Sequence, residues 1–148
     1  YRMMLPGVSA IDVEGRSDLF QPLAAGAREQ GKAIIASFHD FQRTPALPVL
    51  RKMAFRARKH GATVVKIAAM IRGVGDIAVL YQALELQKAG PLCVIGMGPL
   101  GMSTRIGLPC LGSCLAYGHL ERASAPGQIH CEKMKTLLQM FSCHVMLY

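Results

Sequence analysis

Residues 63–68 read Thr63-Val-Val-Lys-Ile-Ala68, a β-type run with an ammonium group at Lys66 where an apolar residue is expected. Burying a lone lysine is costly unless it is paired or neutral, and a neutral amine is a nucleophile toward ketones. One strand earlier, residues 32–38 run directly into His39. A lysine and a histidine at neighbouring strand ends suit imine formation followed by proton transfer.

Strand and helix patterns alternate on both sides of this run. We expect Gly31 and Gly61 to end two helices, and Thr44 and Pro45 to begin the second as its N-cap and first helical residue. Asp76 is expected to cap the next helix. The predicted strands are 8–13, 32–38, 63–68, 92–97 and 112–117. The predicted helices run from about 17 to 30, from 45 to 60, from the cap at 76 to near 90, over about 103–108, and finally through residues 134, 137, 138 and 141. Five strand-and-helix units predict a parallel α/β architecture in one domain, 1–148.

The alternation of side chains along a strand places the two polar groups on one face. Lys66 shares its face with Val64 and Ala68, and His39 shares its face with Ile35 and Ser37. The other face of a parallel barrel strand is buried under helices, so Lys66 is expected to point into the interior. Sites in such barrels lie at the C-terminal ends of the strands, where His39 also falls.

The chain of 148 residues is 51% hydrophobic and carries a net charge of +8, which favours anionic partners. Much of the positive charge lies in Arg51-Lys52 and in residues 56–60, opposite apolar positions with helical spacing. This stretch is either a solvated helix face or a binding patch. The chain has no Trp and few aromatic residues, so nothing supports a base-stacking platform, and we expect no nucleic-acid partner.

The five cysteines contain no C-x-x-C pair, and Cys110, Cys114 and His119 do not complete a recognisable ligand set. We therefore expect reduced, mostly buried thiols, no metal and a cytoplasmic location. No apolar run approaches the roughly 20 residues that cross a bilayer, and no signal peptide is visible, so no membrane partner is expected. Because the first residue is Tyr1 and a strand follows closely, we expect the sequence to be part of a longer reading frame.

Several short motifs, in order along the chain, resemble those of type I 3-dehydroquinate dehydratase. They are Ile11-Asp-Val-Glu14, Ser37-Phe-His-Asp-Phe41 with Thr44-Pro45, Gly61-Ala62 with Val65-Lys-Ile-Ala68, Met97-Gly-Pro-Leu-Gly101 with Thr104-Arg105, Gly112-Ser113, and Ser124-Ala-Pro-Gly-Gln128. The family is an eight-stranded (β/α) barrel, and the resemblance implies that this chain carries a partial TIM barrel, its last five units. Early-strand substrate motifs of the family, a Glu-x-Arg and a later Arg and Glu, have no counterpart here. Thr104 replaces the usual Ser, and Ile95 stands where some members have Met.

The resemblance also implies a mechanism that needs no cofactor. Lys66 would form a Schiff base with the ketone of 3-dehydroquinate, and His39 would act as general base and then general acid. Arg105 would hold the substrate carboxylate, while Ser124 and Gln128 would bind substrate from a closing loop. Met97 would pack against the substrate ring.

Each residue also has an ordinary structural explanation. Lys66 could extend from a strand end or pair with an acid, and His39 could be a hydrogen-bonded core histidine. Arg105 could cap a helix or pair with Glu121, and residues 124–128 could form a surface turn.

At the level of function, the main alternative is a catalytically idle truncated barrel that serves as a fragment or assembly module. A Schiff-base aldolase on the same barrel shares the lysine but gives no reason for the 124–128 loop. Five strands leave two open edges, so we expect a homodimer or association through those edges. The missing early strands lead us to expect that the isolated chain has little activity.

Overall fold

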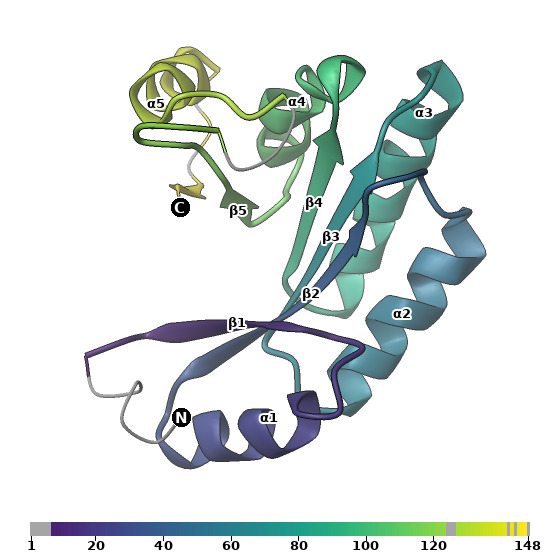
Figure 1. The fold of residues 1–148 in the computed structure, drawn as a ribbon. Helices are drawn as coiled ribbons and strands as arrows, with labels where there is room; N and C mark the ends of the chain where they lie inside the picture. The colour runs from purple at the N-terminus through teal and green to yellow at the C-terminus, as the bar shows by residue number, and fades with distance from the viewer. Residues whose placement is uncertain (1–6, 124–126, 142, 144, 148) are drawn as a thin grey trace.

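The computed structural model describes residues 7–123, 127–141, 143 and 145–147. Four parallel strands form one sheet in the order β1-β2-β3-β4, and each is followed by helical structure (Figure 1). The elements are β1 (Ala10–Glu14), α1 (Phe20–Glu29), β2 (Ala33–Asp40), α2 (Leu47–Lys59), β3 (Val64–Met70), α3 (Val74–Ala83), a 3-10 helix (Leu84–Ala89), β4 (Leu92–Met97), a 3-10 turn (Pro99–Gly101), α4 (Thr104–Cys110), β5 (Leu115–Ala116), α5 (Cys131–Met140) and β6 (Met146–Leu147). The predicted parallel α/β architecture is confirmed.

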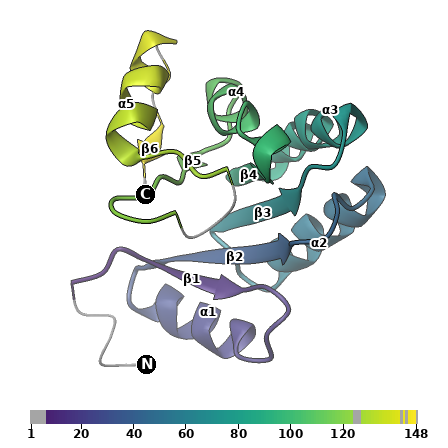
Figure 2. The same cartoon turned by 45° about the horizontal axis from the view of Figure 1, so that its top comes forward.

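The two faces of the sheet have different surroundings. Figures 1 and 2 show α1, α2 and α3 on one side of the sheet and α5 with β5 on the other. The helix-covered face carries the main apolar core, in which strand residues such as Val65 and Ile67 pack among Phe20, Leu50 and Leu80. This is the face on which alternation placed Val65 and Ile67, so that prediction is confirmed.

The opposite face carries a smaller cluster of apolar residues around the polar ones. Ile35, Ala68, Cys93, Ile95, Met97 and Leu115 form this cluster. The strand register places Ser37 beside Lys66 and Lys66 beside Cys93, while His39 lies beside Ala68. Lys66 and His39 therefore emerge from neighbouring strands on the same face of the sheet, as expected.

The fifth strand is shorter than predicted. β5 contains only Leu115 and Ala116, and it pairs with β6 in a separate two-stranded parallel sheet. The segment before β5 still lies beside β4, because the Ser113 hydroxyl accepts a hydrogen bond from the Val94 N–H at 2.9 Å. A side chain thus takes the place of a ladder hydrogen bond, which ends the regular sheet at β4.

The prediction of reduced thiols was wrong for two of the five cysteines. Cys110, at the end of α4, and Cys143, after α5, form a disulfide, with their Cα atoms 5.1 Å apart. Both lie at a small apolar cluster that includes Met134 and Leu138 of α5. The two cysteines are 33 positions apart, and nothing in the sequence indicated that folding brings them together. Cys93 is buried and free, and Cys114 and Cys131 are free and partly buried.

The predicted starts of three helices were wrong by a few residues, and α1 begins at Phe20 instead of near residue 17. α2 begins at Leu47, with Ala46 as N-cap and a proline in its first turn, and the Thr44 hydroxyl instead donates to the Met70 carbonyl at 2.8 Å. Asp76 is not the N-cap of α3 but its third residue. Its carboxylate accepts from the backbone N–H groups of Arg72, at 2.7 Å, and Gly73, at 3.3 Å. An acid at this position satisfies free N–H groups of the first turn as a cap would.

Within the part of the chain that the structure describes, every helix is too short or too polar to span a bilayer.

Candidate active site

Lys66 lies in the middle of β3 and is only 8% exposed. Its Nζ donates to Oδ2 of Asp12 on β1 at 2.8 Å, and the Ser37 hydroxyl donates to the other oxygen of the same carboxylate. Nζ also lies 4.2 Å from the centre of the Tyr117 ring, within reach of a cation–π contact. The ammonium is thus paired, as burial requires, and it is held between an acid and an aromatic face.

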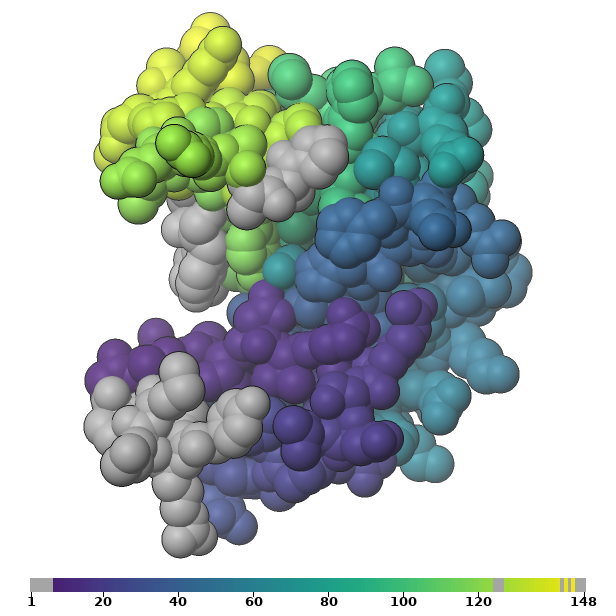
Figure 3. Space-filling model, in the orientation of Figure 1, coloured from purple at the N-terminus to yellow at the C-terminus, as the bar shows by residue number. Residues whose placement is uncertain are grey.

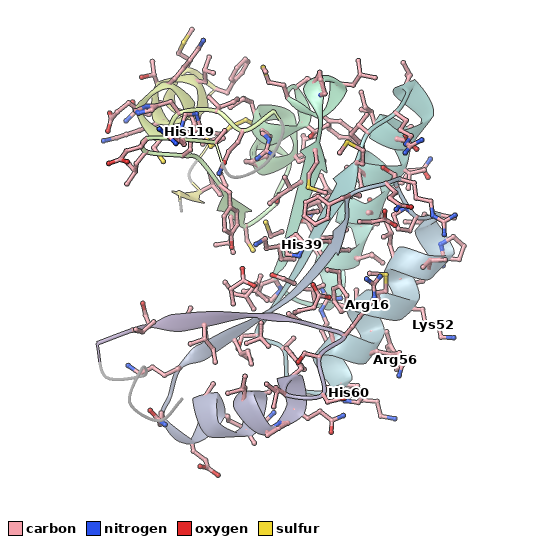
Figure 4. All side chains as sticks on the ribbon, viewed as in Figure 1. Arg16, His39, Lys52, Arg56, His60 and His119 are labelled. Carbon is pink, nitrogen blue, oxygen red and sulfur yellow. A yellow bond between two sulfur atoms is a disulfide. The ribbon has the colours of Figure 1, made fainter. Side chains whose placement is uncertain are left out.

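His39 lies near the C-terminal end of β2, with its side chain 32% exposed. Its Nδ1 lies 3.3 Å from Oε2 of Glu14, the last residue of β1, and its ring stacks on that of Phe41 at 6.0 Å between centroids. Figure 4 labels His39 on the side of the sheet that faces β5. The partial exposure disfavours a sealed core histidine, and the carboxylate favours the tautomer with the proton on Nδ1.

A cavity of about 170 Å³ joins the two residues. Its lining comprises His39, Phe41, Lys66, Ala68, Ile95, Met97, Arg105, Tyr117 and Gln128. In Figure 3 the surface is hollowed between the purple segment of β1 and the green and yellow segments that follow β4. Five of the six predicted site residues therefore share one cavity, and the sixth, Ser124, lies outside the described residues.

Arg105 reaches the cavity from α4 and is 5% exposed. Burial lowers the pKa of Arg105, but a guanidinium stays charged at neutral pH. Its Nη1 donates to the Tyr117 carbonyl at 3.5 Å. A buried guanidinium beside an apolar floor is suited to holding a carboxylate.

The start of α4 is fixed against β4 by Thr104. The Thr104 hydroxyl donates to the Gly101 carbonyl at 2.6 Å and accepts from the Gly96 N–H at 3.0 Å. A Cβ on Gly101 would lie 2.5 Å from the Gly96 carbonyl carbon, so only glycine permits this close approach. The two glycines and Thr104 thereby determine where the next residue, Arg105, enters the cavity.

Gln128 lies at the end of the segment that follows β5. Its Nε2 donates to the Gly118 carbonyl at 2.8 Å. A parallel bridge between His119 and His130 closes the base of this segment, with the His119 N–H donating to Ile129 O at 3.1 Å. Figure 4 shows His119 on this segment, beside α5. The bridge holds Gln128 at the cavity edge.

Sequence reasoning gave no role to three residues that contact the predicted pair: Asp12, Glu14 and Tyr117. Asp12 and Glu14 alternate along β1 as acids in an otherwise apolar strand, which was a usable sign that they face the interior. Tyr117 had no such sign, because its position depends on how the chain leaves β5. Among the described residues no three His, Cys, Asp or Glu side chains are arranged to hold a metal ion.

Comparisons with known proteins agree with the geometry. Residues 1–144 match the protein family described as Type I 3-dehydroquinase. The 3-dehydroquinate dehydratase of Methanosarcina barkeri is 37% identical over 141 residues, which are 90% of this chain and 58% of that protein. The one from Methanococcoides burtonii is 36% identical over 88% of this chain and 56% of its own length.

Solved structures give the same result. The 3-dehydroquinate dehydratase of Geobacillus kaustophilus matches with a TM-score of 0.85 and 29% identity, over 91% of this chain and 54% of that one. The enzyme of Aquifex aeolicus matches with a TM-score of 0.79 and 32% identity, over 90% and 60% of the two chains. The chain spans a little over half the length of these four relatives.

Proposed function

The chain belongs to the type I 3-dehydroquinase family, and on that premise we propose that its cavity binds 3-dehydroquinate and dehydrates it through a Schiff base on Lys66. One observation carries this proposal: Lys66 and His39 stand on neighbouring strands and line one cavity with a buried arginine. That is the arrangement a lysine imine and a proton-transfer group require.

The reaction begins at Lys66. The ammonium gives up one proton, the neutral amine adds to the C3 ketone, and loss of one water with return of that proton leaves an iminium. The iminium carries the same positive charge as the ammonium it replaces, so Asp12 and the Tyr117 ring stabilise it in the same place. The positive nitrogen withdraws electrons and makes the adjacent C2 proton acidic.

His39 transfers the protons in the next steps. It removes the C2 proton as general base, and the resulting enamine expels the C1 hydroxyl, which leaves as water after taking that proton from the imidazolium. Glu14, 3.3 Å from Nδ1, orients the ring for these transfers. A second water then hydrolyses the imine and releases 3-dehydroshikimate, so the net change is the loss of one water.

Arg105 and Gln128 bind the substrate during these steps. We assign the substrate carboxylate to the Arg105 guanidinium, with Gln128 at the cavity edge as a hydrogen-bonding partner. The same role for Ser124 rests on the sequence resemblance alone. Met97, 2% exposed on the floor, packs against the ring.

The assembly and location of the protein belong to the same proposal. β1 is the first strand of the sheet order, so one of its edges has no strand partner among the described residues. An open edge favours association with a second strand, either in a homodimer or with a chain that completes the barrel. The cytoplasmic location stays a prediction.

The partial length favours a second candidate, a catalytically idle barrel fragment. Because the chain spans little more than half of its relatives, substrate groups that the other part would hold lose their partners, and we expect slow turnover.

Product analysis tests the proposal. The purified chain is incubated with 3-dehydroquinate, and products are separated and identified by mass. We expect slow formation of 3-dehydroshikimate above the protein-free rate, abolished in Lys66→Met and in His39→Asn. It should be retained in Lys32→Met, which changes a half-buried lysine outside the cavity. No product above the protein-free rate would favour the idle fragment, and cleavage of a carbon–carbon bond would indicate an aldolase.

A further inference from the structure

A second and larger cleft lies on the helix-covered side of the sheet, with a volume of about 530 Å³. It is bounded by the loop after β1, the start of α1 and the second half of α2. Its lining residues are Gly15, Arg16, Ser17, Asp18, Phe20, Gln21, Phe38, Met53, Arg56, Ala57 and His60. None of these residues lines the catalytic cavity. On β2 the two sites are separated by the sheet, because Phe38 and His39 point to opposite faces of the strand.

The floor of this cleft is apolar. Phe20 and Phe38 are 3% and 5% exposed, and Met53 and Ala57 of α2 complete the floor. Gly15 packs directly on Phe38, since a Cβ there would lie 2.4 Å from the ring. The ring therefore has no room to swing toward β1 and gives the cleft a fixed base.

The rim of the cleft carries two arginines and one histidine. Arg16 comes from the loop after β1, with its guanidinium 5.9 Å from the centre of the Phe38 ring. Arg56 lies in α2, and His60, one turn later, is the C-cap of that helix and hydrogen-bonds Gln21 of α1. One carboxylate, Asp18, also lines the cleft. Figure 4 labels Arg16, Arg56 and His60 on the same side of the sheet, beside α2.

This geometry accounts for part of the basic stretch in the sequence. Arg51 and Lys52 are exposed and lie outside the cleft lining, so they form an ordinary solvated face. Arg56 and His60 instead lie over an apolar hollow of the size that small-molecule sites occupy, roughly 300–1,000 Å³. A cationic rim above an aromatic floor is suited to a ligand with an anionic end and an apolar body.

We propose that this cleft is a binding site for a small ring carboxylate, distinct from the catalytic cavity. The ring packs on Phe38 and Met53, and the carboxylate is held by Arg56 and Arg16. An inorganic anion would contact only the two arginines and not the apolar floor, so it binds less tightly than a ring carboxylate.

Solution NMR of the full 148-residue chain tests this site with benzoate as the probe. The signal of the His60 ring C–H, at one fixed pH, reports the cleft without reporting the catalytic cavity. We expect a saturable shift with benzoate, about tenfold weaker binding in Arg56→Gln, and a much weaker effect of inorganic phosphate. Lys52→Gln is the matched control, since it removes one positive charge from the same helix outside the cleft. The affinity of this variant for benzoate should stay within about twofold of the wild-type value.

Three results would overturn the proposal. The first is no saturable shift of the His60 signal, and the second is equal weakening by Arg56→Gln and Lys52→Gln, which would indicate general charge attraction. The third is phosphate binding as tight as benzoate binding, which would show that the apolar floor does not contribute. Arg56 is exposed, so its replacement leaves the fold intact.

Discussion

At the scale of single residues, the site depends on how a buried ammonium is accommodated. Lys66 could be located from sequence because it interrupts a β-type run, but its partner Asp12 lies 54 residues away. The sequence left open whether Lys66 pairs with an acid or acts chemically, and the structure shows that it is paired with an acid inside a cavity. The ion pair therefore does not argue against a chemical role.

The strength of that pair can be measured with a double-mutant cycle of Asp12→Asn and Lys66→Met. We expect a coupling energy of about 1 kcal/mol, because the Lys66 side chain is buried while that of Asp12 is 37% exposed and partly screened by water. Urea unfolding of the four proteins gives the value. A coupling below about 0.3 kcal/mol would mean that the contact does not hold the amine in place.

Cys93 provides a pH-dependent prediction at the same scale. Burial raises the pKa of its thiol to about 12, while in the unfolded chain it ionises near 8.5. The folded state thus keeps a proton that the unfolded state loses, so this contribution to stability is complete below about pH 8.5 and is lost as the pH rises toward 12.

The measurement compares free energies of unfolding at pH 7 and pH 10 for the wild-type chain and Cys93→Ala. We expect the wild type to lose about 1–2 kcal/mol more than the variant over this interval. Cys131→Ala, at a free and partly buried cysteine, should lose as much stability between pH 7 and pH 10 as the wild type does. Equal losses in the wild type and Cys93→Ala would show that the Cys93 thiol is not sealed from water.

At the scale of elements, the strand patterns located β1 to β4 well, and the errors fall where side chains replace backbone contacts. Thr44 and Asp76 both lie near helix starts, but neither is the N-cap, because one bonds to Met70 and the other serves as the third helical residue. β5 is shortened because Ser113 takes a ladder position. Whether a side chain replaces a backbone hydrogen bond in this way depends on which backbone group it meets in the folded chain. The sequence pattern does not contain that information.

The junction between β4 and α4 gives a prediction about an element. Gly101→Ala should destabilise the chain by about 1–3 kcal/mol, because its Cβ would meet the backbone of Gly96 at 2.5 Å and push α4, with Arg105, away from β4. Gly26→Ala is the matched control, since it lies inside α1 with no atom within 4 Å of the added Cβ. It should be neutral or stabilising by up to about 1 kcal/mol. Urea unfolding gives the free energies of unfolding of both variants. Equal values for Gly101→Ala and Gly26→Ala would contradict the close approach of Gly101 to Gly96.

At the scale of the whole molecule, the fold class and the shared face of Lys66 and His39 followed from strand alternation and the order of motifs. Alternation alone is enough to place two residues on one face, whatever the details of the loops. The disulfide between Cys110 and Cys143 could not be predicted, because it depends on how α5 packs against α4. The second cleft could not be predicted either, since its floor and rim come from β2, α1, α2 and the loop after β1.

The central claim is that one amine, at Lys66, meets a substrate ketone in this cavity. The most direct measurement is borohydride reduction of the chain with 3-dehydroquinate, followed by intact-mass analysis and peptide mapping. The account predicts one substrate-derived adduct per chain, located on Lys66, absent in Lys66→Met and preserved in Lys32→Met. No adduct, or an adduct distributed over exposed lysines with Lys66 unmodified, would contradict it.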